Sequence, residues 1–246
     1  MPESQSWEYL QGRFWSKPEE ILSRTTTFYV ERILIMYSEI RQEARMMLQG
    51  LWTELVPVWF IFALITAGAS AVFDGFGSLI TIVIGGPITM GITRIFLKIY
   101  RKEAFEFGQM FDGFKEFNRT FTAYLLISIY TFLWALLLIV PGIIAALGYS
   151  QTFFIMAENP NISASDAMRQ SKQMMFGHKT ELFLLNLSFI GWAILASIPF
   201  GIGWFWLQSY IFASLTIFYK RIKGEAAVVT EPVNQPEPVP VDETIN

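Results

Sequence analysis

The sequence predicts an all-α integral membrane protein with six transmembrane helices arranged as three hairpins. Only 16% of its 246 residues are charged, whereas soluble domains carry about 25%, and 53% are hydrophobic. The apolar residues are gathered into three long blocks, and lysine and arginine lie outside all three. This combination of composition and segregated charge is typical of a polytopic helical membrane protein.

The three apolar blocks are nearly equal in length. Residues 120–157 and 182–219 contain no charge, and residues 55–93 contain only Asp74. A single helix of about 38 residues would reach roughly 57 Å, almost twice the bilayer core of about 30 Å. Each block also has helix-ending residues at its centre: FDGFG at 73–77, VPG at 140–142 and PFGIG at 199–203. We therefore expect six membrane-spanning helices, at about 54–73, 78–97, 120–139, 142–157, 181–199 and 203–219.

The two competing architectures fit the sequence less well. A soluble helical core would show polar faces at helical spacing, and a β-barrel would alternate apolar and polar residues. Neither pattern runs through the three blocks.

The basic residues predict the orientation. All 18 lysines and arginines lie before, between or after the blocks, so hairpins would place every one on the same side of the membrane. The positive-inside rule makes that side cytoplasmic. The amino terminus lacks the pattern of a cleavable signal peptide. We expect a multi-pass protein of the bacterial inner membrane with both termini in the cytoplasm.

A short motif before each block suggests a threefold internal repeat. MLQG at 47–50, MFDG at 110–113 and MMFG at 174–177 are almost evenly spaced along the chain. An amphipathic helix is predicted before each block, with Ser163 and Asp166 capping the third and Gly177 ending it. These helices either lie at the membrane interface or pack on the bundle as connectors.

Three parts of the chain differ in composition. Residues 1–25 form a polar cytoplasmic extension, residues 26–225 form the membrane domain, and residues 226–246 form an acidic, proline-rich tail expected to be disordered.

Few residues of the chain suggest chemistry. There is no cysteine and only one histidine, His178, which excludes disulfides, thiolate sites and histidine-pair metal motifs. No catalytic or nucleotide-binding motif occurs. We expect no enzyme activity, no catalytic residue, no metal or cofactor, and no nucleic-acid partner. Gln151, Asn186 and Gln208 are the informative polar residues of the spans, serving either inter-helix hydrogen bonds or a polar pathway.

Several short sequence elements match a known family: Pro141-Gly142-Ile143, Tyr149-Ser150, Asn159-Pro160, Ala167, Ser171, Met175-x-Gly177-x-Lys179, Leu182-Phe183 and the run from Leu187 to Trp192. In these elements the chain resembles a family of bacterial polytopic membrane proteins catalogued as domain of unknown function 975. The resemblance covers roughly residues 38–225, is most specific over 140–192, and extends to GPITMG at 86–91. It implies a bacterial inner-membrane protein and carries no activity.

Two functions remain open. The first is a non-enzymatic membrane scaffold, or an assembly or envelope-maintenance component, whose partners are the lipid bilayer and proteins recruited by the tail and the amphipathic helices. The alternative is a transporter or channel for a small or amphiphilic solute. A hydrated central cavity lined by the three amides would favour transport, and a dry bundle would favour the scaffold. The oligomeric state is left open.

Overall fold

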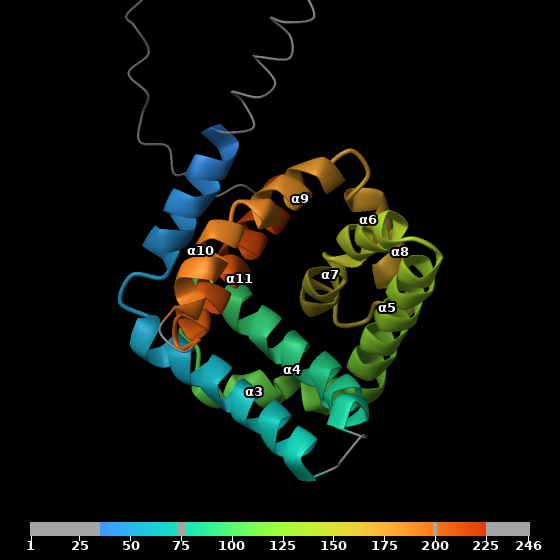
Figure 1. Ribbon diagram of the computed structural model, residues 1–246, viewed down its shortest axis with the longest axis horizontal. Coiled ribbons are helices and arrows are strands. Elements are labelled where there is room, and N and C mark those ends of the chain that lie inside the picture. Colours follow the sequence, from blue (N-terminus) through green and yellow to red (C-terminus); the bar gives the residue numbers. More distant parts are fainter. Residues whose placement is uncertain (1–34, 73–76, 199–200, 225–246) are drawn as a thin grey trace, which may run out of the picture.

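The protein is all-helical over the residues that its computed structural model describes, namely 35–72, 77–198 and 201–224 (Figure 1). The amino-terminal extension, the acidic tail and the predicted turn at Asp74 lie outside these ranges. The elements in chain order are the helix Ile35–Met47, α3 (Trp52–Val72), α4 (Gly77–Tyr100), the 3₁₀ helix η1 (Phe107–Glu116), α5 (Phe117–Leu137), α6 (Ile139–Tyr149), α7 (Thr152–Glu158), α8 (Ala164–Met174), α9 (Lys179–Leu187), α10 (Ile190–Ser197) and α11 (Gly203–Ile222).

Consecutive helices pack as three pairs, one from each apolar block. Pair 1 is α3 with α4, pair 2 is α5 with α6–α7, and pair 3 is α9–α10 with α11; within them α3 contacts α4, α5 contacts α6, and α10 contacts α11. The second members meet in the interior, where α4 contacts both α7 and α11. Phe154 stacks on Tyr219 with ring centroids 5.1 Å apart, and Phe212 lies 5.1 Å from Phe96. Aromatic side chains therefore fill the space between the three inner helices.

Two of the predicted helices are interrupted. The predicted helix 142–157 is α6 followed by α7, with a break at Ser150 and Gln151, and the predicted helix 181–199 is α9 followed by α10. The chain also turns earlier than the proline-glycine pair suggested. Extended Leu138 separates α5 from α6, while Pro141 lies in the first turn of α6, where a backbone N–H has no intrahelical acceptor.

The predicted amphipathic segments pack against the bundle. The helix Ile35–Met47 buries Tyr37, Ile40 and Ala44, and the Tyr210 hydroxyl of α11 donates to its backbone at 3.2 Å. Ser163 caps α8 as predicted, its Oγ accepting from the Asp166 N–H at 3.1 Å. The second segment is a 3₁₀ helix, η1, rather than an α-helix. The helix Ile35–Met47 and α8 bury their less polar faces within the protein, and their position at a membrane interface stays a prediction.

The amphipathic elements and the pairs form a closed ring (Figure 1). Element η1 packs on α4 of pair 1, α8 packs on α5, α6 and α7 of pair 2, and the helix Ile35–Met47 lies along α11 of pair 3. Each element thus contacts the pair that precedes it, and the first element contacts the last pair.

The glycines of the repeated motif have two different roles. Gly50 and Gly177 have φ of +79° and +86°, a left-handed conformation that only glycine adopts easily, and Gly177 follows the α8 cap residue Met175 by two positions. Gly113 has no such conformation; it is buried against the carbonyl oxygen of Pro87 in α4. The glycine of the motif therefore lies in a turn before the first and third apolar blocks, and at a contact between helices before the second.

Four segments of the described residues are long and apolar enough to cross a membrane: Thr81–Tyr100, Phe107–Leu137, Ile139–Glu158 and Lys179–Ser197. A fifth counts if Ile35–Met47 and Trp52–Gly68, bent by 98°, form one broken span. The predicted helix at 203–219 exists as α11 but is not among these segments, and the predicted 54–73 counts only as part of the bent pair.

Candidate functional site

A buried carboxylate joins three elements at one end of the inner helices. Glu158, the last residue of α7, has a side chain that is only 6% exposed. It pairs with Lys220 of α11, whose side chain is 3% exposed, and with Lys223 at 2.6 Å. Arg101, just after α4, lies 3.0 Å from the carboxylate, and the Tyr219 hydroxyl donates to it at 2.8 Å. These contacts hold the ends of α4, α7 and α11 together.

A second network fixes the other side of the same loop. Arg119 of α5 donates to the carbonyl of Asn159 at 2.9 Å and to those of three further residues, Met156, Pro160 and Ile162. It also pairs with Glu116, which lies 2.7 Å from Arg94. Because the last carbonyls of a helix lack intrahelical donors, Arg119 caps the end of α7. Both networks are structural clamps in which each carboxylate is shared between cations.

Sequence reasoning missed both clamps. The available signal was Glu158, the first charged residue after the uncharged block 120–157, followed directly by Asn159 and Pro160. A carboxylate at the end of such a block needs a cation. The cations that pair with Glu158 lie 57 to 65 residues away in sequence, so the spacing of charged residues could not identify them.

The three predicted amides lie in different surroundings. Gln151 is fully buried at the α6–α7 break; its Nε2 donates to Ser150 Oγ at 3.0 Å, and its Oε1 has no hydrogen-bond partner. Asn186 is exposed and donates to the Leu182 carbonyl of its own helix at 3.0 Å, and Gln208 is half-buried on α11. None of the three lines the pockets described below, so their role remains a prediction.

Serine hydroxyls satisfy the backbone at the α6–α7 break. Ser171 Oγ, on α8, donates to the Gly148 carbonyl at 2.8 Å and accepts from the Gln151 N–H at 3.1 Å. One side chain thus donates to the backbone on one side of the break and accepts from the backbone within it, and it ties α8 to pair 2.

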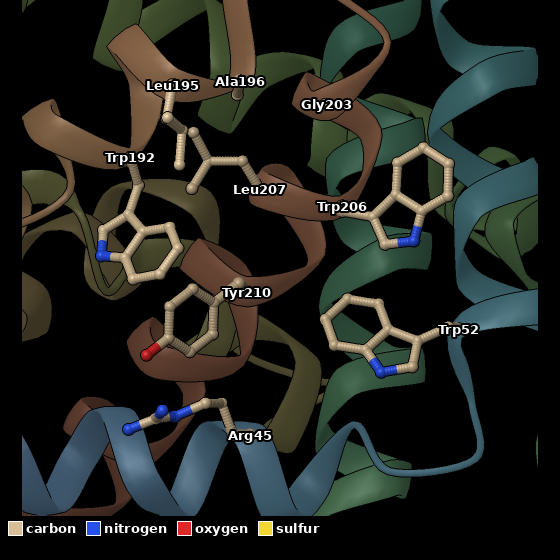
Figure 2. A pocket seen from close by; sticks show the side chains of 9 residues that line it. All are labelled: Arg45, Trp52, Trp192, Leu195, Ala196, Gly203, Trp206, Leu207 and Tyr210. Carbon is tan, nitrogen blue, oxygen red and sulfur yellow. The ribbon is translucent and has the colours of Figure 1, made fainter. Parts of the chain in front are cut away.

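An apolar cavity of about 340 Å³ lies between the helix Ile35–Met47, α3, α10 and α11 (Figure 2). We call it the arginine pocket. Arg45 stands at one end beside Tyr210, and Ala196, Leu195 and Gly203 lie at the opposite end. The pocket is lined by Arg45, Trp52, Trp192, Leu195, Ala196, Gly203, Trp206, Leu207 and Tyr210.

A smaller cavity of about 170 Å³ lies between α5, α6, α8 and α9. We call it the lysine pocket. Its apolar wall is formed mainly by α6, and Lys172 and Lys179 are its charged residues. The pocket is lined by Trp134, Pro141, Ile144, Ala145, Gly148, Tyr149, Lys172 and Lys179.

Elsewhere in the described part of the chain, Glu39 and Glu43 both pair with Arg221 at 3.1 Å. The single histidine, His178, faces Glu181 with Nδ1 2.8 Å from the carboxylate. Among the described residues no group of three or more His, Cys, Asp or Glu side chains is placed to hold a metal ion.

The fold and these sites define a helical protein with several apolar helices of membrane-spanning length, clamped at one end by buried ion pairs. The family model described as "Protein of unknown function (DUF975)" matches residues 36–147 and 136–226. The chain belongs to this family, in agreement with the resemblance seen in the sequence. No curated protein and no solved structure matches the chain.

Proposed function

We propose that the protein is a non-enzymatic integral membrane protein of the bacterial inner membrane, with three helical hairpins and both termini in the cytoplasm. The observation that carries this proposal is the apolar outer surface. Large apolar side chains stand exposed along the α5–α6 turn, including Leu136, Leu138 and Ile139, and others along α10 and the start of α11. In water such a continuous surface would be unfavourable, whereas lipid tails would cover it.

The ionic contacts support the proposal that the lysines and arginines lie on one side of the membrane. The clamps at Glu158 and Arg119 join residues that the hairpin arrangement places on the cytoplasmic side, and the exposed apolar turns lie at the predicted outer ends. The ring in which each amphipathic element packs on the preceding pair supports the threefold repeat.

Within this location we propose a scaffold, assembly or envelope-maintenance role. Support comes from the interior, where the rings of Phe96, Phe154, Phe212 and Tyr219 fill the space between the inner helices. The amphipathic helices and the tail are the proposed surfaces for protein partners.

Cysteine labelling tests the hairpin topology directly, because the natural chain contains no cysteine. Gly142 packs against Ala135, so Leu138, 65% exposed in the turn itself, is the better position. In intact cells an impermeant maleimide should label Leu138→Cys and Ile202→Cys. Lys115→Cys should react only after permeabilisation. If Lys115→Cys is labelled in intact cells and Leu138→Cys is protected, the protein has the opposite orientation in the membrane and the proposal is refuted.

One observation favours transport as a second candidate function. Transporters often place their substrate at interrupted helices, and here the α6–α7 break contains a buried glutamine whose Oε1 lacks a partner. In this candidate, Gln151 would face a solute or ion path in another state of the protein.

Accessibility of position 151 separates the two functions. For the scaffold, Gln151→Cys should resist a small membrane-permeant thiosulfonate in the native protein and react after denaturation, because the side chain is fully buried. Lys115→Cys, at an exposed site, serves as the reactive control. Rapid native-state modification of Gln151→Cys would indicate a hydrated path and favour transport.

A further inference from the structure

The arginine and lysine pockets are built from residues at matching positions of the repeat. Lys172 follows Arg45, and Lys179 follows Trp52, by the same interval at which MMFG follows MLQG in the repeated motif. Arg45 and Trp52 line one pocket, and Lys172 and Lys179 line the other. The elements before the first and third blocks therefore contribute equivalent positions to the two pockets.

The helix pairs contribute equivalent positions as well, related by a single constant interval in the sequence. Trp134 corresponds to Leu195, Ala145 to Trp206 and Tyr149 to Tyr210, and all six line the pockets. The tight contact that closes each pair also recurs.

At that contact a Cβ on Gly142 would come within 2.7 Å of Ala135, and one on Gly203 within 2.8 Å of Ala196. The two glycines, and likewise the two alanines, are separated by the same interval that relates Ala145 to Trp206. The two pockets are thus the same site built twice, each between a helix pair and the amphipathic element of the following unit.

The segment before the second block differs at both positions: Lys115, which corresponds to Trp52 and Lys179, pairs with Asp112 at 2.7 Å, and the other position carries no cation. Gly108 of η1 takes the place of Arg45 and Lys172, because it precedes MFDG by the same two positions at which they precede MLQG and MMFG. There η1 and α4 are in backbone contact, Gly91 against Met110 and Gly113 against Pro87.

Within the described residues, the cations of the two pockets have no acidic partner. Arg45 donates only through Nε, to the Arg41 carbonyl at 3.4 Å, and no carboxylate among the described residues pairs with Arg45, Lys172 or Lys179. The one acidic side chain in the first turn of α9, Glu181, faces His178 instead. Lys179 extends across Gly148, so that its ammonium would lie 3.7 Å from a Cβ there. Lys179 is half-buried, whereas Arg45 and Lys172 are exposed, so the cost of a charge against an apolar wall without an anion falls mainly on Lys179.

We propose that both pockets bind anionic phospholipids, the phosphate at the cation and an acyl chain along the apolar wall. An apolar groove that ends at an arginine or lysine, with no carboxylate partner among the described residues, matches one class of ligand, an anion attached to a hydrocarbon chain. Tryptophan and tyrosine rings beside the cation suit the region where a headgroup meets its tails. The inference rests on the proposed membrane location.

Native mass spectrometry of the full chain, released from detergent micelles, tests the sites by counting retained lipids. The probes are phosphatidylglycerol and phosphatidylcholine with the same acyl chains. We expect two phosphatidylglycerol molecules to be retained per chain above the phosphatidylcholine level. Arg45→Gln should lose one, Lys172→Gln with Lys179→Gln should lose the other, and the triple variant should lose both. Each loss should correspond to about a tenfold or greater fall in affinity, typical of a charged hydrogen bond.

Matched variants separate binding from folding. Arg169→Gln, on α8 but paired with Asp166, should retain both lipids. Arg45→Lys and Lys172→Arg keep the charge and should also retain both. Ala145→Trp should fill the lysine pocket, which has half the volume of the arginine pocket that accommodates Trp206, without altering its charge, and should therefore lose one lipid. Thermal unfolding of each variant in lipid-free detergent shows whether it is folded.

Several results would overturn the proposal. Equal retention of phosphatidylcholine would refute recognition of the anion, and unchanged counts in the folded charge variants would refute these two pockets. Displacement by equimolar inorganic phosphate would identify a free-anion site. If lipid is retained only after deletion of residues 1–25, that segment, rather than a lipid, is the natural occupant of the pockets. Failure of the membrane location would show separately, in the labelling of Leu138→Cys and Lys115→Cys.

Discussion

Adding a single methyl group at Gly113 or Gly91 should destabilise the protein strongly. Both glycines lie where α4 and η1 meet backbone to backbone; a Cβ on Gly113 would overlap the Pro87 carbonyl oxygen, and one on Gly91 would overlap the Met110 carbonyl oxygen. Neither backbone can move aside as a flexible side chain would. Overpacking typically costs about 1–3 kcal/mol, and here the upper end is expected, which corresponds to a fall in Tm of about 10 °C for a chain of this size.

Thermal unfolding in detergent of Gly91→Ala and Gly113→Ala measures this effect. The matched control is Gly108→Ala, in the same 3₁₀ helix as Gly113, where a Cβ meets no atom within 4 Å. The control should unfold near the wild-type temperature. If Gly113→Ala unfolds no earlier than Gly108→Ala, η1 does not pack on α4 in the way described.

Removing the Glu158 carboxylate should have the other large effect. Glu158→Ala takes away the anion shared by Lys220, Lys223 and Arg101, and both Glu158 and Lys220 are almost fully buried. Breaking a buried pair at one partner typically costs about 3–5 kcal/mol, because a charge is left in a poorly solvated place. We expect a fall in Tm of about 10 °C or more.

A double variant distinguishes the ion pair from simple loss of volume. Replacing both partners with residues of similar size, Glu158→Met with Lys220→Met, should recover part of the stability lost in Glu158→Met, because no isolated carboxylate or ammonium of that pair remains. The comparison is Asp112→Ala, which breaks the exposed pair with Lys115 and should cost under about 1 kcal/mol. Equal effects of Glu158→Ala and Asp112→Ala would show that Glu158 is not a buried hub.

The position of the chain reversals illustrates what local sequence could and could not predict. A turn near the centre of residues 120–157 followed from the length of the block, and the structure contains one. Its residue is Leu138 rather than the Pro141-Gly142 pair, since proline is tolerated in a first helical turn and the glycine is needed for contact with Ala135. Local rules identify residues that can turn a chain, but packing determines which of their properties is used.

The repeated motif carries the same lesson. Its spacing predicted a threefold repeat, which stays a prediction; in the structure two of its glycines lie in left-handed turns. The remaining glycine, Gly113, is instead a point of helix contact, and its segment is a 3₁₀ helix with Phe111 and Phe114 exposed along it. The conformation of a short segment depends on the surface it meets, here α4 with Gly91 at the contact.

The sequence by itself determined the helical class, the three apolar blocks, the cap at Ser163 and the family, because helix length, composition and capping are properties of neighbouring residues. Only the tertiary structure brought Glu158 to Lys220, Arg119 to the end of α7, and Arg45 to Tyr210. The partners in each of these contacts lie far apart in sequence, and their meeting depends on how the inner helices pack. The ring of helix pairs and the two pockets therefore emerge from packing, where residues of separate blocks first come into contact.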